Sequence, residues 1–348
     1  MKKYFYTLLF LGLGCVSAFA GNPDRQGEAG AAELLLNPWA RSAGLHSMST
    51  ASVSGVEAMR INIAGLSRLN KGELVVANTR LYEGSTLGIN ALGFATKAGK
   101  NGAFGLSLVA MDFGDINVTT TSQPEGTGAT YSPSFFNIGL GYAYTYENKI
   151  SVGILVRAVS ETLPDVAANG FAIDAGVQYV SGDRDEFKLG IALRNIGSPM
   201  EFGGEGLSFR TDAPGSEPSY QITVNQRAED FELPSLLNIG VSYDFYVQED
   251  IFVRGLVNFT SNAFARDDFG VGAEFSFKDL VVLRGAYKIA LEPAPNGVED
   301  NLYSGFAGGV SIDVPLKRAD NRIVGIDYAY RATNVFRGTH NFSLRLGF

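Results

Sequence analysis

Residues able to carry out acid–base or nucleophilic chemistry are few in this sequence. The 348 residues include two histidines, His46 and His340, and one cysteine, Cys15. A hydrolase needs a nucleophile with a base within hydrogen-bond reach. His46 lies in a stretch rich in Gly, Ser and Ala, and His340 opens the last predicted strand, so neither has a recognisable partner. The sequence therefore predicts that the protein is not an enzyme.

Two segments that look like catalytic motifs lack the context those motifs need. Asp112-Phe113-Gly114 matches a kinase metal-binding tripeptide, but no glycine-rich loop with a strand lysine and no catalytic-loop pattern accompanies it. Gly139 and Gly141 lie within a predicted strand and open no helix, so they predict no dinucleotide site. No spacing of His, Asp and Glu indicates a transition-metal site. No cofactor is expected.

The composition points instead to a membrane barrel. The chain has a formal net charge of −8, which argues against nucleic acid as a partner. It contains no apolar run of the roughly 18 residues that a membrane-spanning helix requires. The 42 glycines, 24 phenylalanines and 15 tyrosines fit a barrel, in which aromatics form interfacial girdles and glycines allow close packing.

The first twenty residues have the pattern of a secretory signal peptide. Lys2 and Lys3 precede a short apolar stretch, and Ala18-Phe19-Ala20 forms a small-x-small cleavage site. Cys15 is interpreted as an incidental apolar residue of this segment; the alternative is a lipoprotein acylation site, although Gly12 stands where such sites usually have Leu. Cleavage after Ala20 would leave no cysteine, which excludes disulfides and thiolate metal sites.

The last ten residues, 339–348, alternate between the two faces of a strand. Phe342, Leu344, Leu346 and Phe348 are apolar, and polar or small residues stand between them. This period of two, with an aromatic at the carboxyl terminus, is typical of the closing strand of an outer-membrane barrel. We therefore expect these four residues to be the insertion signal, the barrel assembly machinery to be a partner, and the Gram-negative outer membrane to be the location.

Thirteen further segments also read as membrane strands, because each is close to the roughly 9 to 11 residues that a tilted strand needs. Ala91 and Leu92 break the phase of the second. The predicted strands are residues 73–81, 86–96, 102–113, 135–146, 150–160, 170–181, 186–196, 236–247, 250–261, 268–277, 280–290, 302–314, 322–332 and 339–348.

The connections between these strands alternate in length. Those assigned to the periplasm, such as 147–149 and 248–249, are short, whereas those assigned to the outside include 114–134 and 197–235. Outer-membrane barrels show this asymmetry, and the competing fold, a soluble β-sandwich, has no reason to. The fold class predicted is all-β, a transmembrane antiparallel barrel of about fourteen strands spanning residues 73–348.

Residues 21–72 precede the first strand and contain a cluster of apolar residues around Leu34 to Leu36 and Trp39. We interpret this segment as a plug folded into the lumen, because small lumen-facing residues leave space to fill; the alternative is a periplasmic tail. The longest outer loop, 197–235, is either an ordinary solvated loop or a partner-binding surface. Its candidate binding residues are Glu201, Glu205, Asp212 and Glu217.

Two stretches resemble the PorV/PorQ proteins of the type IX secretion system of the Bacteroidetes, a family related in fold to long-chain fatty-acid transporters. The second stretch, residues 170–174 through 189–197, is similar to the mid-barrel hairpin of the family. The first carries the motif residues Arg41, Gly44, Asn62, Ala64 and Gly65 within Gly30-Ala31-Ala32, Ala40-Arg41-Ser42-Ala43-Gly44-Leu45 and Asn62-Ile63-Ala64-Gly65-Leu66, with Ile63 where the family has proline.

The resemblance implies a fourteen-stranded barrel with a non-enzymatic role. Such proteins associate with the secretion pore and receive or present cargo, so type IX export accessory is the first functional hypothesis. The second is uptake of hydrophobic small molecules, which predicts an apolar lumen pocket near Leu34 to Leu36 and Trp39. A lipid-modifying enzyme is the third, and no placed catalytic group supports it.

Overall fold

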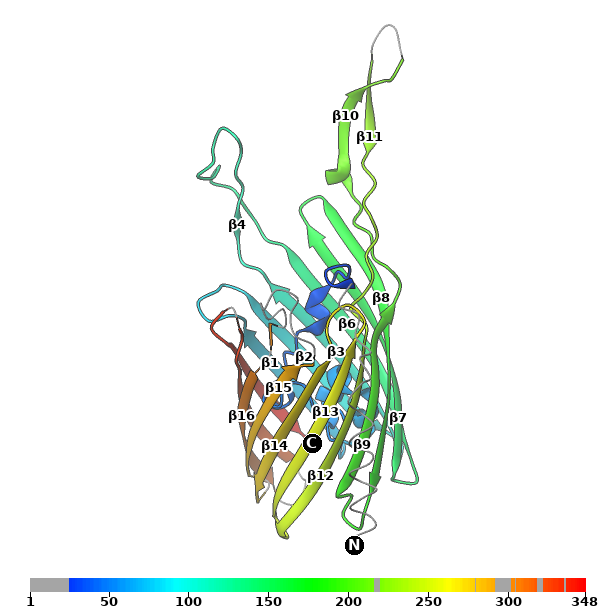
Figure 1. The fold of residues 1–348 in the computed structure, drawn as a ribbon, viewed down its shortest axis with the longest axis vertical. Coiled ribbons are helices and arrows are strands. Elements are labelled where there is room, and N and C mark those ends of the chain that lie inside the picture. The colour runs from blue at the N-terminus through cyan, green and yellow to red at the C-terminus, as the bar shows by residue number, and fades with distance from the viewer. Residues whose placement is uncertain are drawn as a thin grey trace.

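A closed barrel of fourteen antiparallel strands forms the body of the molecule (Figure 1). The computed structural model describes residues 25–215, 220–278, 280–291, 302–303, 305–317, 322–334 and 336–348. The predicted signal peptide, with Cys15, and the candidate loop residue Glu217 lie outside these ranges. Neighbouring strands follow one another along the chain, and β1 closes the barrel against β18.

Each of the fourteen predicted strands is present, with its ends shifted by a few residues. The largest differences flank the predicted connection 161–169, most of which is strand, so that β7 and β8 form a taller part of the wall. The barrel strands are β1 (Gly72–Arg80), β2 (Gly88–Ala98), β3 (Gly102–Asp112), β6 (Ser134–Tyr146), β7 (Ile150–Leu163), β8 (Val166–Ser181), β9 (Phe187–Gly197), β12 (Leu236–Gln248), β13 (Ile251–Asn262), β14 (Asp268–Phe277), β15 (Val281–Ala290), β16 (Gly305–Lys317), β17 (Arg322–Arg331) and β18 (Thr339–Gly347).

The closing strand has the two faces that its alternation predicts. Phe342, Leu344, Leu346 and Phe348 point outward and are 38–48% exposed, whereas Asn341 and Ser343 between them are buried. An apolar outer face and a polar inner face are what a barrel in lipid requires.

The predicted phase break in the second strand is wrong. Along β2, Ala91 is buried on the inner face, and Asn90 and Leu92 are exposed on the outer face. The sequence was misleading because Ala91, on the inner face, is apolar, whereas Asn90, on the outer face, is polar.

The two ends of the barrel differ in their connections. At the short-turn end the strands join through turns such as 147–149 and 249–250; at the opposite, long-loop end two hairpins rise well beyond the barrel (Figure 1). These hairpins were not predicted. They contain β4 (Ile116–Asn117) paired with β5 (Thr130–Tyr131), and β10 (Ser208–Asp212) paired with β11 (Gln221–Asn225).

Residues 31–71, called here the luminal segment, run through the barrel interior. Just before it, Arg25 pairs with Glu232 of the loop at the long-loop end, and near its other end Arg68 Nη2 donates to the backbone oxygen of Lys149 in a short turn. The segment is drawn in blue inside the barrel in Figure 1. Its short helices are η2 (Ala32–Leu35), α2 (Ala40–Ala43), η3 (Gly55–Glu57), α3 (Ala58–Ile61) and η4 (Ile63–Arg68). No helix in the described ranges has the length and apolar character needed to cross a membrane.

The luminal segment packs against a wall of small residues. Trp39, Val56, Met59 and Leu66 are buried in one apolar cluster together with wall alanines such as Ala143. A Cβ added to Gly153 of β7 would lie 2.9 Å from the carbonyl carbon of Ile63, and one added to Gly141 of β6 would lie 2.7 Å from Ile63 Cδ1. Glycine at these positions lets η4 approach the wall, so the many glycines of the strands serve packing.

Candidate binding site in the barrel lumen

Arg41 ties the luminal segment to the barrel wall. Its Nε lies 3.1 Å from Glu57 Oε1 in the same segment, and its Nη2 lies 3.2 Å from Glu73 Oε1 of β1. Glu73 also accepts the backbone N–H of Val56 at 2.6 Å. Burial disfavours the charged guanidinium, but the nearby carboxylates of Glu73 and Glu57 outweigh it and raise the pKa of Arg41 above its usual range.

The other predicted motif residues also lie inside the barrel. Gly44 ends α2 where that helix meets the wall, and a Cβ there would be 3.1 Å from the Cα of Gly309 in β16. Asn62 caps η4 by accepting the backbone N–H of Ala64 at 3.2 Å, and its Nδ2 donates to the carbonyl oxygens of Thr50 at 2.9 Å and Val177 at 3.0 Å.

Ala64 and Gly65 are buried in η4, and a Cβ on Gly65 would clash with the carbonyl oxygen of Val53. The structure therefore places all five motif residues in contact regions between the luminal segment and the wall. Their contacts position the segment.

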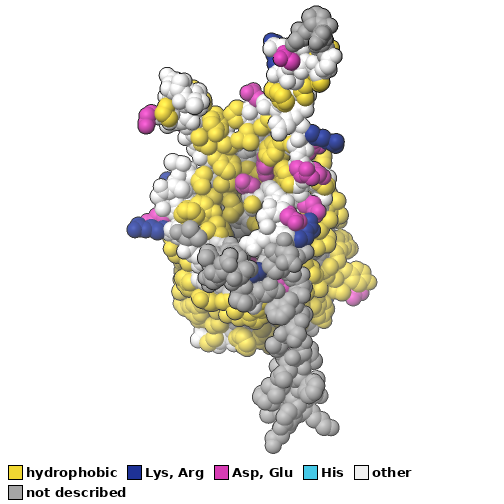
Figure 2. All heavy atoms as spheres, turned by 45° about the horizontal axis from the view of Figure 1, so that its top comes forward, with side chains coloured by type: hydrophobic (Ala, Val, Ile, Leu, Met, Phe, Trp, Pro, Cys, Tyr) yellow, Lys and Arg dark blue, Asp and Glu magenta, His cyan; other side chains and the backbone are white. Residues whose placement is uncertain are grey.

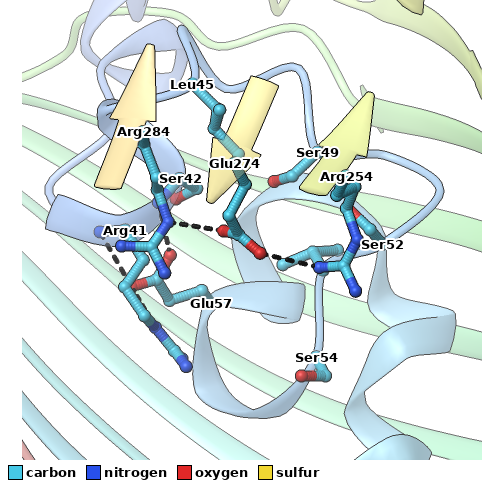
Figure 3. A pocket seen from close by; sticks show the side chains of 11 residues that line it. Arg41, Ser42, Leu45, Ser49, Ser52, Ser54, Glu57, Arg254, Glu274 and Arg284 are labelled. Carbon is cyan, nitrogen blue, oxygen red and sulfur yellow. Dashed lines mark hydrogen bonds and ion pairs between the residues drawn. The ribbon is translucent and has the colours of Figure 1, made fainter. Parts of the chain in front are cut away.

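A polar pocket of about 110 Å³ separates the luminal segment from β13, β14 and β15 near the short-turn end. Figure 3 shows Glu274 between the two wall arginines: Arg284 Nε is 2.7 Å from Glu274 Oε2, and Arg254 Nη1 is 2.9 Å from Glu274 Oε1. Arg41 and Glu57 line the opposite side together with serines of the segment. Charged and hydroxyl groups make the lining of this pocket suit water better than an apolar solute.

A second cavity, of about 20 Å³, lies between the luminal segment and β3, β6 and β7, closer to the long-loop end. One part is apolar and includes Leu36, Trp39 and Met59; the other is polar and includes Arg60 and Arg157. Of the residues around which an apolar pocket was predicted, Leu36 and Trp39 line this cavity and Leu34 and Leu35 do not, and its volume suits little more than one water molecule. A larger solute could enter only if the luminal segment moved.

A buried charged cluster beside this cavity was missed by the sequence analysis. Arg157 Nη2 lies 2.9 Å from Asp174 Oδ2, its Nη1 donates to Asn195 Oδ1 at 3.0 Å, and Arg194 is 7% exposed with no hydrogen-bond partner on Nε or Nη2. A β-bulge lets Arg194 and Asn195 of β9 oppose the single residue Asp174 of β8. Arg60 also reaches this region, so arginine outnumbers carboxylate there.

Ionisable side chains within membrane strands mark functional sites by default. Arg157, Asp174 and Arg194 all fall inside predicted strands. That was the signal that could have found the cluster.

Apolar side chains surround the mouth of the barrel. Figure 2 looks toward the long-loop end and shows hydrophobic residues gathered around a hollow between the two hairpins. Leu34 is fully buried in a cluster with Leu81, Phe135 and Met200, and half-buried Phe202 and Phe231 pack against that cluster. An apolar molecule reaching this end meets a surface of its own polarity.

The remaining candidate residues lie apart from the lumen cavities. Glu201, Glu205 and Asp212 are exposed on the loop between β9 and β12. His46 is buried in the luminal segment, and His340 bonds through Nδ1 to the hydroxyl of Tyr328 on the wall at 2.9 Å. Within the described ranges, no group of three or more His, Cys, Asp or Glu side chains is arranged to hold a metal ion.

Comparisons with known proteins identify the fold. No protein-family profile and no curated protein sequence matches the chain. Solved structures similar to it include the CymD monoaromatic hydrocarbon channel (TM-score 0.59, 15% identity, 90% of this chain and 98% of that one), the Pseudomonas putida toluene transporter TodX (0.52, 13%, 86% and 96%) and a Pseudomonas aeruginosa FadL homologue (0.53, 10%, 89% and 98%). The chain has the closed fourteen-stranded fold of these FadL-like outer-membrane barrels.

Proposed function

We propose that the protein takes up hydrophobic small molecules across the outer membrane. The observation that carries this proposal is the apolar mouth, whose buried cluster is joined through Leu36 to the cavity lined by Leu36 and Trp39. The solved structures of similar fold support it, because two of them are a monoaromatic hydrocarbon channel and a toluene transporter. Uptake of hydrophobic small molecules, the second functional hypothesis from the sequence, therefore becomes the first.

Transport requires the luminal segment to move, because it fills the lumen from mouth to base. A solute would leave water at the apolar mouth, where burial of each Å² of apolar surface contributes about 25 cal/mol. It would then pass the Trp39 cavity once α2 and the residues beside it withdraw from the wall, while the end of the segment next to β1 stays in place. The polar pocket beside Arg254, Glu274 and Arg284 offers an aqueous continuation toward the short-turn end.

A disulfide that fastens the segment to the wall tests this mechanism. A Cβ built on Gly44 lies 3.5 Å from the Cβ of Ala329 in β17, within the range of about 3.5–4.5 Å found in disulfides. The only native cysteine, Cys15, lies in the predicted signal peptide. We expect cells producing Gly44→Cys with Ala329→Cys to take up radiolabelled toluene slowly when oxidised and normally after reduction.

A matched control is a disulfide that spares α2. Ser67 Oγ and Thr145 Oγ1 are buried 2.7 Å apart, close to where the segment joins β1. Ser67→Cys with Thr145→Cys should cross-link without slowing uptake. Equal uptake by oxidised and reduced Gly44→Cys/Ala329→Cys protein, or uptake no faster than in cells lacking the barrel, would contradict the proposal.

The second candidate is an accessory of type IX secretion that binds the secretion pore and its cargo in a Bacteroidetes-like outer membrane. The exposed hairpin β10–β11 favours it, because Phe209 is 50% exposed and Tyr220 is 60% exposed beyond the barrel. Large apolar side chains in water often mark a protein interface. Deleting the gene and finding every type IX substrate still secreted and surface-attached would count decisively against this role.

A further inference from the structure

We propose that the outer surface of β17, β18, β1, β2 and β3 binds a phosphorylated glycolipid of the outer leaflet, of the lipid A type. This lipid site faces the membrane and is separate from the lumen. Its occupancy does not depend on the proposed uptake function.

A groove of about 640 Å³ runs along this outer surface. It arises where short side chains stand in register: Asn78 of β1 is opposite Asn90 of β2, and Asn90 is opposite Ala110 of β3. The neighbour of Asn78 on the other side, Phe342 of β18, is large and forms one bank. The remaining apolar surface of the groove comes from Val76, Leu92, Leu108, Ile326 and Leu344.

Two asparagines in the groove interrupt an otherwise apolar surface. Asn78 Nδ2 donates to Asn90 Oδ1 at 2.8 Å, and both residues are exposed on the outer face. Within the described ranges, no other hydrogen bond involves Asn78 Oδ1 or Asn90 Nδ2. Because polar groups facing lipid without a partner are costly, an acyl amide, ester or hydroxyl group of a lipid is a suitable partner.

The groove continues into a second depression of about 580 Å³ at the long-loop end, and the two share Asn78 and Phe342. Arg80 and His340, which face each other across β1 and β18, line it. Arg80 is exposed and forms no ion pair with the part of the chain that the structure describes. Glu83 also lines the depression, and its backbone N–H donates to the oxygen of Arg337, a second exposed arginine.

The two depressions together match an anionic amphiphile. Acyl chains would lie against the apolar part, and the amide or ester region would reach the asparagines. A phosphate would meet Arg80 and form charge-assisted hydrogen bonds with it, which are stronger than hydrogen bonds between neutral groups. At a strand spacing of about 4.8 Å, five strands present a surface about 20 Å wide. This width suits a glycolipid with several acyl chains better than a phospholipid with two.

Native mass spectrometry of the full protein released from detergent tests the site. The probes are hexa-acylated diphosphoryl lipid A and dioleoylphosphatidylglycerol. We expect lipid A to bind in preference, Arg80→Gln to weaken its binding about tenfold, and Asn90→Leu, which fills the groove, to abolish it. Ala110→Leu fills the same groove from β3 and should also abolish binding. Either variant can therefore test the groove if the other folds poorly.

Control variants carry the same changes elsewhere. Asn169→Leu replaces an outward asparagine of β8, and Arg210→Gln replaces an exposed arginine of β10; both should bind lipid A as the unchanged protein does. Equal binding of phosphatidylglycerol would overturn the choice of glycolipid. Undiminished binding of dephosphorylated lipid A would overturn the role of Arg80, and undiminished binding to both groove-filling variants would overturn the site.

Discussion

Arg157 and its neighbours show how a few buried charges depend on one another. Asp174 is the carboxylate that Arg157 contacts, and it also accepts the backbone N–H of Asn195 at 2.7 Å. Removing one partner of a buried ion pair leaves the other charge without compensation. Asp174 therefore stabilises both the arginine cluster and the bulge in β9.

We expect Asp174→Asn to destabilise the barrel by about 3–5 kcal/mol, the usual result of breaking a buried pair. The urea midpoint of unfolding, followed by heat-modifiable migration on gels, measures the change. Asp212→Asn, at an exposed position of β10, is the control and should leave the midpoint unchanged. A stable Asp174→Asn barrel would show that Arg157 and Arg194 find compensation elsewhere.

His46 makes stability depend on pH. Burial, followed by the charges of Lys288 and Arg331, lowers its pKa from 6.5 to about 3. Between these values the unfolded chain binds a proton that the folded protein excludes, so this contribution to stability is complete above about pH 6.5 and is lost as the pH falls toward 3. His46→Gln should remove that part of the pH dependence in urea titrations, whereas His340→Gln should retain it.

At the scale of elements, the contact between η4 and β7 has no room for extra atoms. Gly153→Ala would place its Cβ 2.9 Å from the carbonyl group of Ile63 and 3.0 Å from the nitrogen of Ala64. Because these are backbone atoms, η4 must shift, and we expect a loss of about 1–3 kcal/mol in unfolding free energy. Gly285→Ala, where nothing lies within 4 Å, is the matched control. Equal stability of the two variants would refute this packing argument.

The link between β1 and the luminal segment is electrostatic. Glu73→Gln would weaken the Arg41 ion pair while retaining an acceptor for Val56 N–H. We expect faster amide exchange across residues 41–57, measured by hydrogen–deuterium exchange with mass spectrometry. Glu28→Gln, which weakens the exposed pair with Arg25, should leave that exchange unchanged. Protection of residues 41–57 identical to that of the unchanged protein would show that Glu73 does not hold the segment.

At the scale of the whole molecule, the strands were predictable and the contents of the lumen were not. Strands such as β6 alternate between lipid and lumen, so their residues carry the pattern in every second position. Residues 31–71 contact many strands through irregular turns and short helices, and no periodicity records such contacts. The bulge in β9 opposite Asp174 was hidden for the same reason, since a single extra residue leaves the composition of a strand unchanged. The hairpins β4–β5 and β10–β11 are short strands within polar loops, where alternation is too brief to detect.

The seam between the two ends of the wall constrains the order of biogenesis. Gly72 N donates to the oxygen of Phe348 at 2.9 Å and Phe348 N donates to the oxygen of Gly72 at 3.0 Å, immediately after the luminal segment ends. The cylinder is therefore sealed by strands that lie far apart in the sequence, beside the point where the luminal segment ends. Once β1 and β18 have paired, the wall has no gap beside the luminal segment, so we expect Trp39 and its neighbours to pack inside before these two strands close the barrel.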